Sequence, residues 1–217
     1  MSQVLVIGAH GKVAQLALRS LVAAGHEVFG VVRKAEQSDD ISALGAVPVV
    51  ADVEQLSTEE ITEVIGDRDV VVWTAGAGGG SPERTYAVDR DAAIRAVDAT
   101  VASGASRFVM LSYFGAGPDH GVDPDSDFFT YADAKSTADA HLASSDLVWT
   151  ILRPSTLTDG PAGGVAVSPE SGADQVSRAT VAEVITAVVG DPRTAASLTL
   201  EFNDGDRPVA DLVTQDH

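Results

Sequence analysis

Cysteine is absent from the 217 residues of this chain. The absence excludes disulfide bonds, a thiolate nucleophile and any metal site built on cysteine. It also fits a reducing compartment, so we expect a cytoplasmic protein. The five histidines lack the spacing of metal ligands, and we expect no metal site.

Basic residues are scarce, because 14 Lys and Arg stand against 32 Asp and Glu, which gives a net charge of −18. Such an acidic protein does not bind nucleic acid non-specifically or dock on anionic lipid. The apolar runs are only as long as strands, which excludes a membrane span. The N-terminus lacks the basic region and cleavage site of a signal peptide. We therefore expect a monomer or homodimer whose partner is a small-molecule substrate.

Short apolar runs alternate with helical patterns along most of the chain. This alternation is typical of right-handed βαβ crossovers and a parallel sheet covered on both faces. It predicts an α/β, doubly wound parallel-sheet Rossmann fold with a small C-terminal cap, in one domain spanning 1–217. Strands are expected at 3–7, 27–32, 47–50, 69–74, 106–112 and 147–152, and helices at 12–24, 36–44, 57–65, 84–103 and 130–144.

The pattern loosens after the sixth strand. Residues 156–172 are rich in Gly and Pro and predict a turn with a short hairpin. A helix over 179–189 and a strand over 197–202 follow. We expect 154–217 to form a small cap on the substrate side.

A glycine-rich turn follows the first strand. The segment VLVIGAHGKVA places Gly8, Gly11 and Ala14 at three-residue steps between an apolar run and an amphipathic helix. Gly8 allows the turn, Gly11 lets the backbone approach a ligand, and Ala14 lets the helix lie on the strand. The turn directs backbone N–H groups and the positive end of the helix dipole at an anion. The motif favours a dinucleotide pyrophosphate, and the alternative is an ordinary βα turn without ligand.

The second strand ends in cations where NAD-binding sequences carry an acid. Arg33 and Lys34 could hold an adenosine 2′-phosphate, so we expect NADP in preference to NAD. The alternative is a solvated basic strand end. After the third strand, Asp52 could accept from the adenine amino group while Val53 covers the ring. Asp52 could equally cap the next turn.

Tyr131 and Lys135 lie four residues apart on one face of a predicted helix. The ammonium would lower the pKa of the phenol, which could then exchange a proton with a carbonyl or hydroxyl near neutral pH. Three tyrosines and three lysines in 217 residues give about 0.04 such pairs by chance. Ribose binding by Lys135 is the better supported role. The alternative is a structural pair with an exposed lysine.

These motifs, with others along the chain, resemble the short-chain dehydrogenase/reductase superfamily, specifically its small, atypical, epimerase-like branch. The resemblance covers nearly the whole chain and implies NAD(P) binding, but says little about the substrate. The segments that carry it are GAHGKVA, TYAVDRDAAIRAVDA, RFVMLS, YADAK, LVWTILRPSTLTDGP and QVSRATVA.

The resemblance implies two further site residues. Asp89 stands where the superfamily has an active-site Asn that this branch often replaces with Asp. The catalytic serine should follow the fifth strand, where the chain has Ser112 and then Tyr113. Relatives often have two serines there, and the second is frequently the catalytic one. His10 stands where Thr is usual, and Asp159 could face the nicotinamide or, as we favour, fix a turn.

We therefore predict an NADP-dependent oxidoreductase that acts on a small carbonyl or alcohol. Tyr131 would be the general acid/base, Lys135 would hold the ribose, Ser112 the substrate oxygen, and Asp89 would support the site. Alternatives are an epimerase or dehydratase using the same site, and a non-catalytic redox sensor or assembly protein that binds NADP. Candidate cofactor-binding residues are Gly8, His10, Gly11, Lys12, Val13, Arg33, Lys34, Asp52, Val53, Ala75, Gly76, Lys135 and Pro154.

Overall fold

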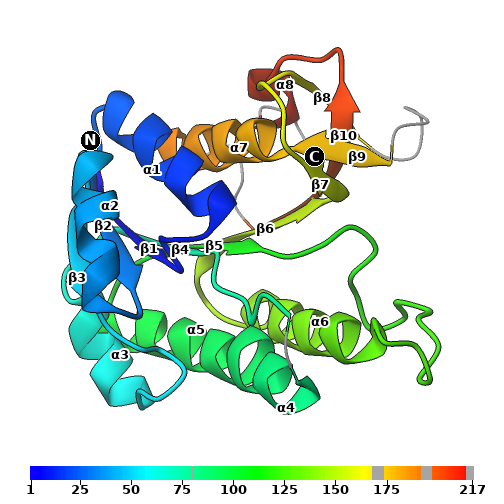
Figure 1. The fold of residues 1–217 in the computed structure, drawn as a ribbon, viewed down its shortest axis with the longest axis horizontal. Helices are drawn as coiled ribbons and strands as arrows, with labels where there is room; N and C mark the ends of the chain where they lie inside the picture. The colour runs from blue at the N-terminus through cyan, green and yellow to red at the C-terminus, as the bar shows by residue number, and fades with distance from the viewer. Residues whose placement is uncertain (80, 168–173, 192–196, 214–217) are drawn as a thin grey trace.

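Strands and helices alternate as predicted in the computed structural model, which describes residues 1–79, 81–167, 174–191 and 197–213 (Figure 1). The predicted strand bounds agree with the observed ones to within two residues for the first six strands. These strands are β1 (Gln3–Ile7), β2 (Glu27–Val32), β3 (Val47–Val50), β4 (Val70–Trp73), β5 (Arg107–Leu111) and β6 (Val148–Pro154).

Eight strands form the main sheet, in the order β3-β2-β1-β4-β5-β6-β10-β8. The first seven run parallel, and β8 (Gly164–Val167) pairs antiparallel with β10 (Leu198–Gly205). The reversal of strand order between β1 and β4 is the switch point at which doubly wound sheets bind ligands. The Rossmann fold class is therefore confirmed.

Helices cover both faces of the sheet, because each helix buries one apolar stripe against it. One apolar cluster joins α1, α2 and α7 to one face, and a second joins α3, α5 and α6 to the other (Figure 1). These helices are α1 (Lys12–Ala23), α2 (Ser38–Ala43), α3 (Thr58–Ile65), α5 (Ala93–Ser103), α6 (Phe129–Ala143) and α7 (Arg178–Gly190). No helix among the described residues is long and apolar enough to cross a membrane.

The helix predicted over 84–103 is interrupted by a wider turn. It begins as α4 (Pro82–Thr85), which Ser81 caps, and continues as a π-helix over Tyr86–Ala92 before α5. π-helical turns are rare and frequently occur at functional sites. Asp89 lies in this turn.

Part of the segment after β6 adds strands to the main sheet, and part of it forms a separate two-stranded sheet. The hairpin expected within 156–172 is wrong for the described part: β7 (Thr156–Thr158) pairs in parallel with β9 (Gln175–Ser177), and β8 pairs with β10. Residues 168–172 of that expected hairpin lie outside the described residues. The helix and strand expected next are present as α7 and β10. A 3-10 turn (Ala35–Gln37) and a short helix, α8 (Val209–Val213), complete the described elements.

Candidate functional site

Three cavities follow one another along the carboxyl edge of the parallel strands. The first, of about 270 Å³, lies at the ends of β1, β2 and β3. The central cavity, of about 630 Å³, lies beyond the glycine turn and reaches Tyr131 and Lys135. The aromatic cavity, of about 610 Å³, lies between β6, β7 and the start of α6. Neighbouring cavities share walls. The first two share Gly11 and residues 74–77, and the last two share Ser112, Phe128, Tyr131 and Leu157.

The glycine turn forms a cradle that side chains would fill. Gly8 has a φ of +87°, and a Cβ there would lie 2.5 Å from the backbone nitrogen of Ala75. Gly11 donates its N–H to the Gly8 carbonyl at 3.0 Å and has a φ of −67°. Its own Cβ would meet only Gly8 O at 3.3 Å and Ala14 Cβ at 4.0 Å. The start of α1 has neither a side-chain cap nor an acidic residue in its first turn. Its N–H groups therefore suit an anion.

The other candidates in this turn differ in where they lie. His10 lines the first cavity, and its Nε2 is 2.9 Å from Asp40 Oδ2. Lys12 is exposed, lines none of the three cavities, and has its Nζ 3.6 Å from Asp159 Oδ2. Val13 is buried in the apolar cluster beneath α1. Asp159 also accepts from Arg178 at 2.7 Å, so it joins the segment after β7 to the start of α7, and the turn-fixing role stays a prediction.

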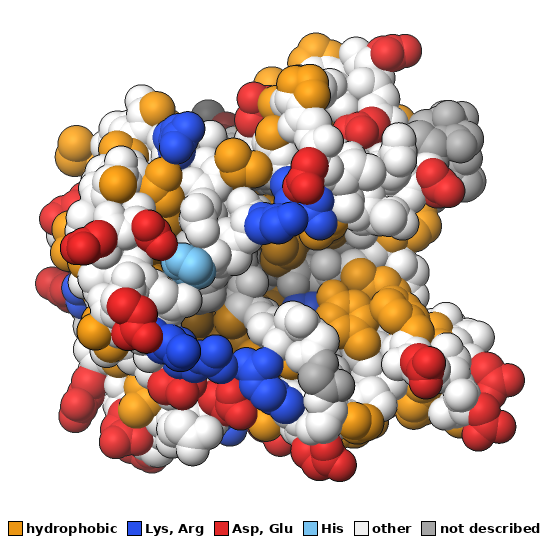
Figure 2. Space-filling model, in the orientation of Figure 1, with side chains coloured by type: hydrophobic (Ala, Val, Ile, Leu, Met, Phe, Trp, Pro, Cys, Tyr) orange, Lys and Arg blue, Asp and Glu red, His pale blue; other side chains and the backbone are white. Residues whose placement is uncertain are grey.

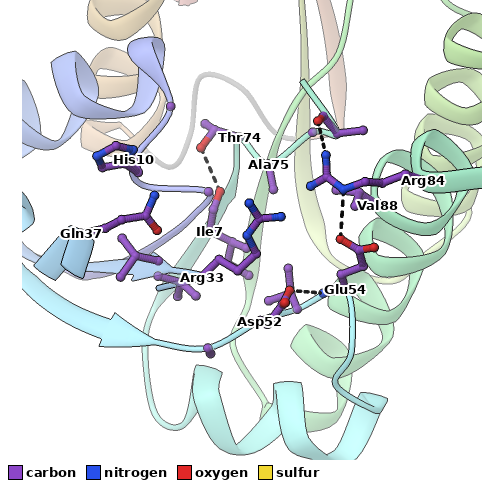
Figure 3. Close-up of a pocket in the computed structure, with 18 residues that line it drawn as sticks. Ile7, His10, Arg33, Gln37, Asp52, Glu54, Thr74, Ala75, Arg84 and Val88 are labelled. Atoms are coloured by element: carbon purple, nitrogen blue, oxygen red, sulfur yellow. Dashed lines mark hydrogen bonds and ion pairs between the residues drawn. The ribbon is translucent and has the colours of Figure 1, made fainter. Parts of the chain in front are cut away.

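Cationic and acidic side chains meet in the first cavity. Figure 3 shows Arg33 reaching in from the end of β2, with Asp52 and Glu54 beside it. Asp52 accepts from the Glu54 N–H at 3.2 Å, so it caps the turn and lines the cavity at once. Both roles considered for Asp52 are thus compatible with its position. Val53 also lines the cavity, whereas Lys34 is exposed and lines none of the three.

Arg84 is a cavity residue that sequence reasoning missed. It enters the first cavity from α4, on the side opposite Arg33 (Figure 3). Its Nε lies 3.4 Å from Glu54 Oε2, and its Nη1 donates to the Ala77 carbonyl. The Ser81-Pro82 helix start was the available signal, since it places Arg84 in a first helical turn. Nothing in the sequence indicated that this turn faces β2.

A buried lysine lies between two carboxylates at the end of the central cavity. The Nζ of Lys135 donates to the Leu111 carbonyl at 2.6 Å, and the side chain is only 2% exposed. Burial lowers the pKa of Lys135, while Asp89 and Asp139 oppose that shift. Asp89 accepts from the Ala77 N–H at 2.9 Å, and burial raises its pKa against the effect of Lys135. Asp89 therefore holds the loop after β4 in place.

Tyr131 lines both the central and the aromatic cavity. The expected lowering of its pKa by Lys135 is wrong. Burial raises the pKa of Tyr131 strongly, and Asp89 and Asp139 add to the shift. The phenol therefore keeps its proton well above neutral pH.

Ser112 lies where predicted but is bonded to a residue that the sequence did not single out. Its hydroxyl donates to Asp139 Oδ2 at 2.8 Å, and Arg153 Nε lies 3.1 Å from the same oxygen. Burial raises the pKa of Asp139 against the effects of Lys135 and Ser112. The neighbouring Tyr113 turns its ring to Tyr131, at a centroid distance of 5.5 Å. Asp139 follows Lys135 by four residues on α6, so the helical spacing that joined Tyr131 and Lys135 was the signal that could have found it.

The remaining candidates lie on the cavity walls. Ala75 and Gly76 line the first and central cavities, and a Cβ on Gly76 would lie 2.9 Å from Asp89 Oδ1. Pro154 lines the aromatic cavity at the end of β6, where its carbonyl accepts from Phe114 at 2.9 Å. Within the described residues, no group of three or more His, Cys, Asp or Glu side chains could hold a metal ion.

Comparison with known proteins gives consistent matches along the chain. Residues 8–192 match the NAD(P)H-binding family. An uncharacterized sugar epimerase, YhfK of Bacillus subtilis, is 33% identical over 97% of this chain and 98% of its own length. A UPF0659 protein of Schizosaccharomyces pombe is 34% identical over 96% of this chain and 92% of its own. A solved structure from Bacillus halodurans, assigned as an NAD-dependent epimerase/dehydratase, has a TM-score of 0.90 and 33% identity, with each chain covered completely.

Proposed function

Because the chain belongs to the NAD(P)H-binding family of epimerase-like and oxidoreductase-like proteins, we propose that it is an NADP-dependent oxidoreductase acting on a small carbonyl or alcohol. One observation carries the proposal. Tyr131 and Ser112 form the wall between the central and aromatic cavities. A proton donor at that position faces a cofactor on one side and a substrate on the other.

The residues present fit a dinucleotide. Gly8 leaves no room for a side chain, a side chain at Gly11 would enter the space above the turn, and the uncapped start of α1 suits a pyrophosphate. Asp52 and Val53 would hold the adenine, and Lys135 would hold ribose hydroxyls if its bond to Leu111 is exchanged. Arg33 and Arg84 face one space in the first cavity, which supports a 2′-phosphate and hence NADP (Figure 3).

When bound, the cofactor supplies or accepts the hydride. Tyr131 handles the proton. Since its pKa is raised, the phenol is protonated at neutral pH and donates to the substrate oxygen as a carbonyl is reduced. The reverse reaction needs the phenolate, which burial and two nearby carboxylates disfavour.

Lys135 and Ser112 shape the environment of that proton. The ammonium interacts with Asp89 and Asp139, which favour its charged form against the effect of burial. Ser112 is already a donor to Asp139, so in this arrangement its oxygen is left to accept from a substrate hydroxyl.

Two other functions keep some support. The name of the Bacillus subtilis relative favours epimerisation, which would use the same Tyr131 through a transient keto form. Non-catalytic binding of NADP, as in a redox sensor or assembly protein, is favoured by the bonds that tie Ser112 to Asp139 and Lys135 to Leu111. Those bonds leave both polar groups less available to ligands.

The test combines binding with turnover. Fluorescence titration with NADPH and NADH should give tighter binding of NADPH. Loss of NADPH absorbance with a panel of carbonyl compounds should then reveal turnover that falls in Tyr131→Phe. Absence of NADPH binding would overturn the proposal. Binding without turnover on any carbonyl, or full turnover in Tyr131→Phe, would favour the non-catalytic function or a different acid.

A further inference from the structure

The aromatic cavity has one wall made of three aromatic rings that pack edge-to-face and tilted against one another. Tyr113, Phe128 and Tyr131 contact one another pairwise, with centroids 5.3 to 5.5 Å apart. Phe128 is 45% exposed and lines both the aromatic and the central cavity. Figure 2 shows hydrophobic side chains gathered beside the central hollow of the molecule, above α6. This wall offers apolar, aromatic surface to a ligand.

The opposite wall is polar. Ser155, Asp174 and Asn203 line it from three neighbouring segments. Backbone bonds join these segments, because Ser155 N–H donates to Phe202 at 3.2 Å and Thr156 N–H donates to Asp174 at 3.2 Å. The Ser155 hydroxyl is buried and has no hydrogen-bond partner in the described part of the chain. A buried polar group without a partner costs free energy, and a ligand hydroxyl, carbonyl or amide could satisfy it.

No cation lines this cavity among the described residues, and its only charged side chain there is Asp174. The sequence SPESGA at 168–173, which precedes Asp174, contains no Lys or Arg either. Among the described residues that line the adjoining central cavity, Lys135 is the only cation, and it is bonded to Leu111 and lies near two carboxylates. A phosphate or carboxylate placed here would lose its hydration without gaining a counter-ion.

Building on the proposed function, we propose that the substrate is an uncharged, flat, aromatic or conjugated carbonyl compound. Its ring system lies against Tyr113, Phe128 and Tyr131, and its polar edge meets Ser155 and Asn203. A cavity of about 610 Å³ suits a molecule of two or three fused rings. Nucleotide sugars are disfavoured, because none of the described residues that line this cavity is a cation that could pair with their diphosphate.

The experiment compares three probes by calorimetry on the full chain, with and without saturating NADP+. They are 2-acetylnaphthalene, its carboxylated analogue 6-acetyl-2-naphthoate, and UDP-galactose. We expect the neutral ketone to bind at least about tenfold more tightly than the carboxylate, and UDP-galactose not to bind. Phe128→Ala should weaken the ketone at least about fivefold. The matched control Phe129→Ala, one residue further and packed on His120, should not.

A variant designed to gain affinity for the carboxylated ketone provides a second test. Thr156 is exposed on the rim of the cavity, so Thr156→Arg adds a cation without disturbing the core. It should raise the affinity for 6-acetyl-2-naphthoate at least about fivefold and leave that for NADP+ unchanged.

Different experimental results would overturn the proposed substrate class and the proposed function. Equal affinity for the neutral and the carboxylated ketone, or UDP-galactose binding that Phe128→Ala weakens, would overturn the inference and leave NADP binding intact. A protein that does not bind NADP+ but still prefers the neutral ketone would overturn the proposed function alone.

Discussion

Replacing Arg33 with alanine should reverse much of the expected preference for NADPH over NADH. Arg33 reaches into the first cavity from the end of β2, and among the described residues no carboxylate lies within ion-pair distance of it. Its charge is therefore free for a ligand, unlike that of Arg84, which lies 3.4 Å from Glu54. A 2′-phosphate is the only part of the cofactor that distinguishes the two forms.

The size of the effect follows from the exposure of the side chain. A hydrogen bond between charged groups contributes about 1.5–3 kcal/mol. Arg33 is exposed, so water and salt screen its charge, and the lower end applies. Losing about 1.5 kcal/mol weakens NADPH binding roughly tenfold. NADH binding should barely change, and the tenfold difference should shrink as ionic strength rises.

Fluorescence titration of both cofactors at low and moderate salt measures these quantities. Arg19→Ala is the matched control, since Arg19 is equally exposed on α1 and lines none of the three cavities. Lys34→Ala should also have little effect, because Lys34 lies outside the first cavity. Equal affinity of the unmodified protein for NADPH and NADH would refute the reasoning, as would an equal loss for both cofactors in Arg33→Ala.

Four further outcomes are expected. Gly11→Val should abolish NADPH binding in calorimetry, because the new side chain enters the cradle. The protein should still fold by thermal melting, because the φ of −67° suits valine. Unaltered affinity would make the turn purely structural. Tyr131→Phe should lower kcat about 10²–10⁴-fold and keep NADPH affinity, as steady-state kinetics and titration would establish. Lys135→Met removes the bond to the Leu111 carbonyl, so chemical denaturation should give a free energy of unfolding about 1–3 kcal/mol lower. NADPH binding should also be weaker, and undiminished binding would exclude a ribose contact. Since the Tyr131 pKa is raised above its ordinary value near 10, kcat/KM for carbonyl reduction should stay level up to about pH 9. A decline of kcat/KM between neutral pH and pH 9 would contradict the role of the neutral phenol as acid.

The fold was predictable because its determinants are local. Each of the first six strands is a short Val/Ile/Leu run next to a helical pattern, and the glycine turn occurs where the first run ends. The pairing of β8 with β10 was not predictable, because it joins segments more than 30 residues apart through backbone bonds. Short strands of this kind leave no hydrophobic period from which a partner could be inferred.

The candidate site was predictable in its residues more than in its electrostatics. The spacing of Tyr131 and Lys135 placed both at the central cavity, as expected from one helix face. Their pKa values depend on burial, on Asp139 one turn further along α6, and on Asp89, which comes from the distant π-helical turn. The same limit explains Arg84, because its direction depends on how α4 is set against β2. Charge contacts between distant segments have no signal in a single sequence.

Because of the π-helical turn over Tyr86–Ala92, deleting or inserting one residue there should disturb the site more than an ordinary substitution would. Deleting one residue from this turn would restore a regular helix and rotate everything on one side of it by about 100° relative to the other. Asp89 would then swing away from Ala77, which it bonds at 2.9 Å. The helices on both sides could remain folded while the loop after β4 lost its anchor. A single codon gained or lost here could therefore create or erase the site, and relatives with and without the extra residue would share the fold but differ in chemistry.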